Sequence, residues 1–128
     1  MIKLTVKSGN NLIQVEGESQ IDVFKAMASA QETFGEEKCG KCGKPNFKYV
    51  VRVAKDEAGD EYEYPELKCT NPGCYAKLSF GQEKKGGGLF PIRFQRDGKN
   101  YVKDKDGKSI PRGTNGWVKY NRETKQEE

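Results

Sequence analysis

The sequence contains no histidine among its 128 residues. Histidine is the commonest general base near neutral pH and a frequent ligand of catalytic zinc, so its absence argues against both kinds of site. No nucleophile with a neighbouring base is recognisable, and we therefore expect a protein that is not an enzyme. The sequence also has no run of 18 apolar residues, which predicts that no segment spans a membrane and that the protein has no membrane partner.

Apolar side chains are scarce as well. Hydrophobic residues make up 34% of the sequence and charged residues 33%, with 15 glycines. This composition predicts one small domain, 1–128, in which a bound metal supplies part of the folding free energy. Within it we distinguish a hairpin and helix (1–35), a central segment (36–82) and a basic extension (83–128). Because no apolar signal segment follows Met1, we expect a cytoplasmic protein.

The four cysteines form two pairs. Two residues separate Cys39 from Cys42, four separate Cys69 from Cys74, and 26 residues lie between the pairs. This spacing is typical of a zinc ribbon, in which four thiolates hold one structural zinc ion. A disulfide framework, a thioredoxin-like redox pair at Cys39 and Cys42, and an iron–sulfur cluster are the alternatives. Glycines in and beside these pairs fit tight turns that close on a metal.

The first 35 residues predict a β-hairpin followed by a helix. Apolar and polar residues alternate over 2–6 and resume over 12–15, with turn residues between them. Ser19 caps a helix over 20–34, and Gly35 ends it. We expect the apolar residues at helical spacing to face the core: Ile21, Phe24, Met27, Ala28 and Phe34.

Three strands are predicted around the cysteines, over 47–54, 62–68 and 75–80. Pro65 lacks a backbone N–H, so we expect the second strand to be an edge or bulged strand. Short strands follow in the last third, separated by turns at Asp97-Gly98 and Asp106-Gly107. The predicted fold is α+β and mainly β. It is an antiparallel zinc ribbon with four cysteine ligands, an N-terminal β-hairpin and helix, and a C-terminal basic β extension.

Charge is unevenly distributed along the chain. Residues 1–74 carry 10 Lys and Arg against 12 Asp and Glu, whereas residues 75–125 carry 13 against 5. Such a basic segment indicates a polyanionic partner, although a basic surface can also be merely solvated. Aromatic side chains alternate with the cations there. The candidate nucleic-acid-binding residues are Lys84, Lys85, Phe90, Arg93, Phe94, Arg96, Tyr101, Lys103, Arg112, Trp117, Lys119 and Tyr120.

Several of these segments resemble the small zinc-ribbon proteins encoded in replication and recombination modules of bacteriophages and prophages. The resemblance is carried by 39–43, 69–74, 78–82, 86–91 and 116–120. It implies nucleic-acid binding, in particular of single-stranded DNA, in the cytoplasm of a bacterial or infected host cell. A protein of the replication or recombination machinery is a further partner that it implies.

The composition of the last third also favours single strands on physical grounds. Unpaired bases expose their faces to aromatic side chains while Lys and Arg follow the phosphates, and the predicted helix has only Lys25 to offer a duplex. We expect about half of the five candidate aromatic residues to lie in the core instead. The alternative function is a protein-interaction adaptor, with the acidic hairpin at 56–66 facing a basic partner. A nuclease using Asp104 and Asp106 is a remote third possibility.

Overall fold

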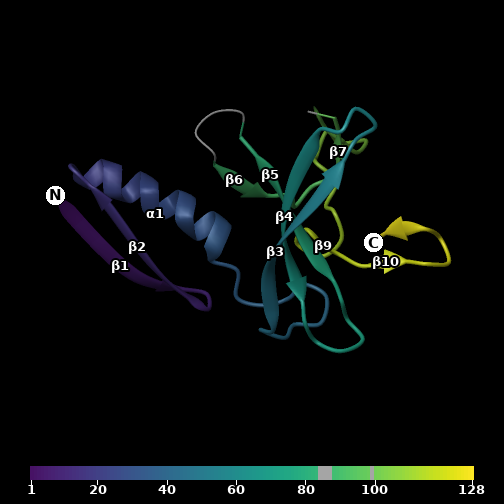
Figure 1. Ribbon diagram of the computed structural model, residues 1–128, viewed down its shortest axis with the longest axis horizontal. Helices are drawn as coiled ribbons and strands as arrows, with labels where there is room; N and C mark the ends of the chain where they lie inside the picture. The colour runs from purple at the N-terminus through teal and green to yellow at the C-terminus, as the bar shows by residue number, and fades with distance from the viewer. Residues whose placement is uncertain (84–87, 99) are drawn as a thin grey trace. The chain divides into compact units, whose positions relative to one another are not determined.

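The computed structural model describes residues 1–83, 88–98 and 100–128 (Figure 1). The chain forms two compact units, Met1–Lys38 with Gln82–Phe90, and Cys39–Gly81 with Pro91–Glu128. The described residues contain one helix, and their paired strands run antiparallel, which confirms the predicted mainly-β α+β class. No helix in these ranges is long and apolar enough to cross a membrane.

The first unit is a hairpin that packs against a helix, as predicted. Strands β1 (Ile2–Ser8) and β2 (Asn11–Gly17) pair in antiparallel register, and α1 (Gln20–Phe34) lies along them (Figure 1). The Ser19 hydroxyl accepts a hydrogen bond of 3.2 Å from the Asp22 N–H at the start of α1. The Gly35 N–H donates to the Gln31 carbonyl at 2.9 Å and closes its last turn. Both helix ends are therefore satisfied locally.

The predicted buried face of α1 is largely wrong. Met27 is buried, but Ile21 and Phe24 are 59% and 75% exposed, and Ala28 and Phe34 are exposed too. Val23 and Thr33 take their place in the core with Met27. A hairpin of two strands is too narrow to cover a broad apolar stripe, so only the side of the helix that faces Ile13 is buried.

The second unit is organised around strands β3, β4 and β5, paired in this order, with β9 also paired to β5. Leu67 of β4, Leu78 of β5 and Trp117 of β9 are fully buried and form its centre. In register, Leu67 lies opposite Leu78, and Leu78 lies opposite Trp117. The strand bounds are β3 Phe47–Lys55, β4 Glu61–Cys69, β5 Lys77–Gln82, β6 Leu89–Pro91 and β9 Trp117–Val118.

The expectation that Pro65 marks an edge or bulged strand is wrong, because β4 lies between β3 and β5. The register explains why proline is tolerated. Strand β5 pairs with β4 only through Glu66, Leu67 and Lys68, so Pro65 lies just beyond the end of this pairing and has a partner, Val51, on the β3 side alone. The missing N–H therefore removes no bond to β5.

Short hairpins complete the second unit. Strands β7 (Arg96–Asp97) and β8 (Asn100–Tyr101) pair across the predicted turn at Gly98, and β10 (Tyr120–Asn121) pairs with β11 (Gln126–Glu127). The Asp104 carboxylate accepts 2.9 Å bonds from the backbone N–H groups of Asp106 and Lys108, which confirms the turn at Asp106-Gly107. Glu127 forms ion pairs with Lys77, at 3.0 Å, and with Arg112, and so ties β11 to the sheet.

Candidate metal centre and adjacent surface

The four cysteines come together as predicted. All four Sγ atoms lie within 4.8 Å of one another. The two close pairs are Cys39 with Cys74, at 3.8 Å, and Cys42 with Cys69, at 3.6 Å, so each joins one turn to the other. These separations far exceed a disulfide bond of about 2 Å, and all four thiols are free. Four convergent thiols of this kind could hold one metal ion.

Two similar turns present the thiols. In the first, which we call turn 1 (39–44), the Cys39 N–H donates to the Lys44 carbonyl at 2.9 Å. In the second, turn 2 (69–76), the Cys69 N–H donates to the Ala76 carbonyl at 2.8 Å. Turn 1 leads into β3, while turn 2 follows β4 directly and leads into β5. The antiparallel pair Phe47 and Cys69 sets the two turns side by side.

The thiols differ in how readily they ionise. Burial raises the pKa of Cys39, and it raises the pKa of Cys69 to about 12, against smaller opposing effects of backbone N–H groups. The pKa of Cys42 instead falls to about 7, chiefly because the Lys44 backbone N–H donates to its sulfur. A metal ion needs all its thiols as thiolates, and the positive charge of the ion would supply the stabilisation that the buried sulfurs lack.

Trp117 lies in the core behind turn 1. Its side chain is 0% exposed, and its ring centroid lies 5.9 Å from that of Phe47. A Cβ added to Gly40 would come within 2.6 Å of Trp117 Cδ1, so only glycine allows turn 1 to approach the indole this closely. The expected stacking role of Trp117 is therefore corrected, since a buried ring has no free face for a base.

The other candidate aromatic residues are divided among three places. Tyr101 is exposed on β8 and Phe94 is exposed two residues before β7, with their rings edge to face at a centroid distance of 6.4 Å. The Arg96 guanidinium lies 5.6 Å from the Tyr101 ring centroid. Tyr120 lies elsewhere, on β10, and is 61% exposed. Phe90 is half-buried on β6. The predicted residues thus do not form one continuous aromatic surface.

Several predicted cations have partners within the protein. Arg93 Nη1 donates to the Asn115 carbonyl at 2.7 Å, and Lys103 Nζ donates to Ser109 Oγ at 2.9 Å. Arg112 forms the ion pair with Glu127. These contacts reduce the availability of the three side chains to an outside ligand. Lys84 and Lys85 lie outside the described residues.

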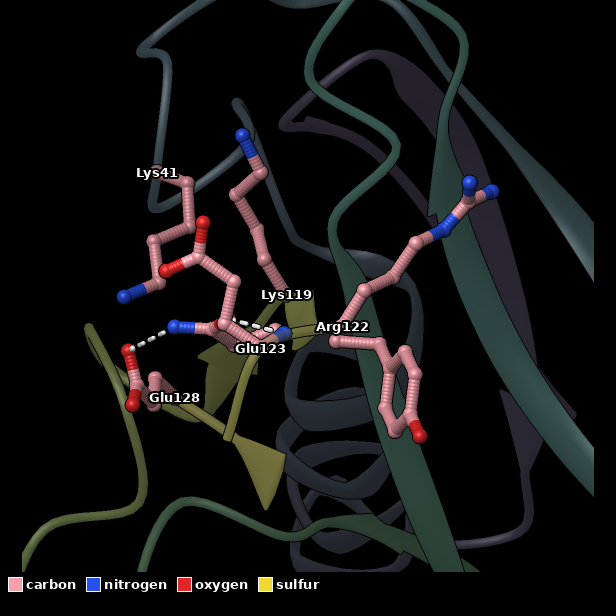
Figure 2. Close-up of a pocket in the computed structure, with 7 residues that line it drawn as sticks. Lys41, Lys119, Arg122, Glu123 and Glu128 are labelled. Carbon is pink, nitrogen blue, oxygen red and sulfur yellow. Dashed lines mark hydrogen bonds between the residues drawn. The ribbon is translucent and has the colours of Figure 1, made fainter. Parts of the chain in front are cut away.

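Beside the cysteines, Lys119 and Arg122 are exposed around a hollow of about 430 Å³ (Figure 2), and Lys119 Nζ donates to the Gly73 carbonyl at 3.4 Å. Lys41, Glu123 and Glu128 also line this hollow, so its charge is mixed. Figure 2 shows the Arg122 side chain extending away from Lys41, Glu123 and Glu128. The Arg122 guanidinium is therefore free of close contact with these two carboxylates.

Tyr75 lies between two further hollows. It is 70% exposed and directly follows Cys74 in turn 2. One hollow, of about 410 Å³, is lined by Tyr75, Tyr120, Lys119 and Arg122 together with Gly73 and Cys74. The other, of about 360 Å³, is lined by Tyr75, Lys48 and Lys68 together with Cys69 and Thr70. Neither lining includes a carboxylate, although Lys119, Tyr120 and Arg122 are shared with the first hollow, whose lining contains Glu123 and Glu128.

Sequence reasoning missed Tyr75, Lys48 and Lys68, because each was assigned only to a strand. The positions of Lys48 and Lys68, each one residue from the paired Phe47 and Cys69, could have indicated them, since antiparallel pairing of the two predicted strands sets these lysines opposite each other. The position of Tyr75 immediately after a candidate cysteine ligand, Cys74, is a second signal. No protein-family model, curated protein or solved structure matches this chain.

Proposed function

We propose that this chain is a zinc ribbon that binds single-stranded nucleic acid, with DNA as the favoured form. The observation that carries the proposal is the hollow beside turn 2, where exposed Tyr120 stands among Lys119, Arg122 and Tyr75 without a carboxylate in the lining. A base can stack on an exposed aromatic ring while neighbouring cations meet the phosphates.

The sulfur geometry supports zinc as the metal. Zn–S bonds of about 2.3 Å in a tetrahedral site place the sulfurs about 3.8 Å apart. The two close sulfur pairs here are separated by 3.8 and 3.6 Å. Four thiolates leave no open position, so Cys39, Cys42, Cys69 and Cys74 would hold a structural ion that joins the two turns. The ion would stabilise the fold and would take no part in a reaction.

The proposal is tested by the anisotropy of a labelled single-stranded oligonucleotide titrated with the metal-loaded protein, with a matched duplex in parallel. We expect tighter binding to the single strand. Lys119→Ala/Arg122→Ala should reduce the slope of log affinity against log salt by about 1.4, if each side chain meets one phosphate. The matched control is Lys105→Ala/Lys108→Ala, which removes the same charge from another exposed place in the same unit. Absence of binding to either nucleic acid at low salt would reject the proposed function.

Three further statements stay predictions of the sequence. They are membership of phage replication and recombination modules, a protein partner from that machinery, and a cytoplasmic location. Four free thiols fit a reducing compartment, and this supports the last of them. A pull-down from the host cell with immobilised protein, with and without nuclease treatment, distinguishes a direct protein partner from one that is bridged by nucleic acid.

A second candidate function, protein interaction, is favoured by strand β3. It is at the edge of the sheet among the described residues, and one of its faces exposes Tyr49, Val51 and Val53. An exposed apolar edge can pair with another strand. A second copy of β3, antiparallel about Val51, fits it, because Arg52 would then oppose Val50 and Lys48 would oppose Ala54, so no two cations face each other.

This alternative predicts a dimer that the edge strand controls. Light scattering after size exclusion should give the dimer mass for the unaltered chain and the monomer mass for Val51→Lys. The control is Leu12→Lys, which makes a similar apolar-to-cationic change at an exposed position on β2, away from the β3 edge. A monomeric unaltered chain would exclude self-association through β3.

A further inference from the structure

We infer that Tyr75 is the central platform of the binding site: one unstacked base lies on its ring, and the backbone of the same strand continues from Lys119 and Arg122 on one side to Lys48 and Lys68 on the other. This inference rests on the proposed function and extends it. It names three residues outside the basic last third, on β3, β4 and turn 2, and it defines the ligand as a single strand that crosses both hollows.

The first argument is the place of Tyr75 between the two hollows. Its side chain lines both of them, and each also contains two lysine or arginine side chains. A nucleotide chain repeats this arrangement, since every base is flanked by a phosphate on each side. Cations on both sides of one exposed ring therefore match a base with its two neighbouring phosphates.

The second argument is a row of lysines across three strands. Lys48 of β3 lies directly opposite Lys68 of β4, which lies opposite Lys77 of β5. Like charges in directly opposed positions destabilise a sheet. Lys77 is neutralised by Glu127 at 3.0 Å, but neither Lys48 nor Lys68 has an ion pair within the described residues. A polyanion in the adjacent hollow would remove this repulsion.

The third argument is the backbone of Tyr75, whose φ of 55° lies in the left-handed region. A bulky residue is rarely found there, and glycine would adopt this conformation without strain. A tyrosine that is 70% exposed contributes little to the core in return. The side chain therefore has a use that offsets the strain, and contact with a ligand is the one that its two hollows support.

The test uses the full, metal-loaded chain, a labelled oligothymidylate and, as a competitor without bases, inorganic polyphosphate. Tyr75→Gly should weaken oligothymidylate binding about 5- to 150-fold, the range for loss of one stacked base, while the competition by polyphosphate stays unchanged. Tyr75→Phe should retain affinity, because it keeps the ring. Lys48→Ala/Lys68→Ala should lower the salt slope by about 1.4, whereas Lys105→Ala/Lys108→Ala should not.

Thermal melting separates a binding role of Tyr75 from a structural one. Tyr75→Gly should melt at the same temperature as the unaltered protein or higher, because glycine suits a φ of 55°. A lower melting temperature together with weaker binding of both probes would make Tyr75 a structural residue and overturn the inference.

The same titrations separate failure of the inference from failure of the proposed function. If the unaltered chain binds and Lys119→Ala/Arg122→Ala weakens binding, but Tyr75→Gly and Lys48→Ala/Lys68→Ala behave like the control, the site ends at the first hollow. The proposed function then stands and the inference fails. If the unaltered chain binds no oligonucleotide, both fail.

Discussion

The two cysteine-containing turns, turn 1 and turn 2, have the same backbone requirement and meet it differently. Each places a left-handed residue directly after its second cysteine, namely Gly43 with a φ of 74° and Tyr75 with a φ of 55°. Turn 1 thus uses the residue that suits this conformation, and its Gly40 packs against the buried Trp117. Turn 2 holds a large exposed ring there at a conformational cost. Turn 1 thus serves packing, whereas the side chain in turn 2 serves, in our inference, for contact with a ligand.

The largest effect is expected where the two turns are equivalent, at their cysteines. Cys42→Ser in turn 1 and Cys69→Ser in turn 2 should each abolish metal binding and unfold the second unit, since structural zinc contributes about 10 kcal/mol or more to folding. Metal content by mass spectrometry and the circular dichroism spectrum measure this. A variant that keeps one equivalent of metal and a native spectrum would show that its thiol is not a ligand.

Gly40→Ala should break the packing side of the comparison. Its new Cβ would lie 2.5 Å from the Thr114 carbonyl oxygen and 2.6 Å from Trp117 Cδ1. Overpacking of this kind costs about 1–3 kcal/mol of unfolding free energy, which urea denaturation would measure. An unchanged midpoint would mean that turn 1 can move away from the indole.

Replacing the left-handed residue of each turn should change the unfolding free energy in opposite directions. Gly43→Ala should lower the unfolding free energy by about 1–2 kcal/mol, although no atom lies within 4 Å of the new Cβ, because the left-handed conformation alone penalises it. Tyr75→Gly should raise it by up to a similar amount, reduced by the freedom that glycine adds to the unfolded chain. Equal signs in urea denaturation would contradict the account of turn 2.

The smallest effect concerns Glu127, which anchors β11 to β5, the strand that follows turn 2. Partial burial raises the pKa of this carboxyl, but Lys77 and Arg112 outweigh it and leave the pKa below the usual 4.5. A carboxyl whose pKa is lower in the folded than in the unfolded protein stabilises the fold at pH values above the unfolded-state pKa. This stabilisation is lost as the pH falls through the folded-state pKa. The group is partly solvated, so we expect about 0.5 kcal/mol. Melting temperatures can be measured from about pH 6 to pH 3, a range that brackets the ordinary carboxyl pKa. They should fall less steeply for Glu127→Gln than for the unaltered protein.

Local sequence signals predicted the elements well and their surroundings poorly. Ser19 and Gly35 mark the ends of α1 because capping depends on neighbouring residues only. The cysteine spacing predicted the convergence of the thiols because the two strands between the cysteine pairs, β3 and β4, form a hairpin that returns the second pair to the first. The exposure of Phe24 and the burial of Trp117 depend instead on which segments pack against them, and periodicity does not contain this information. Tyr75 was missed because its candidate role depends on residues of β3, β4 and β10 that line the same hollows, and the sequence does not show that these residues are its neighbours.

The burial of Trp117 against Gly40 has an optical consequence. It is the only tryptophan in the chain, so all indole fluorescence comes from a side chain that is packed against Gly40 of turn 1. Removal of the metal by a chelator should release this turn, expose the indole to water and shift its emission to longer wavelength. With a metal bound as proposed, Trp117 would serve as an intrinsic indicator of metal loading, which can be followed in a cuvette without any added dye.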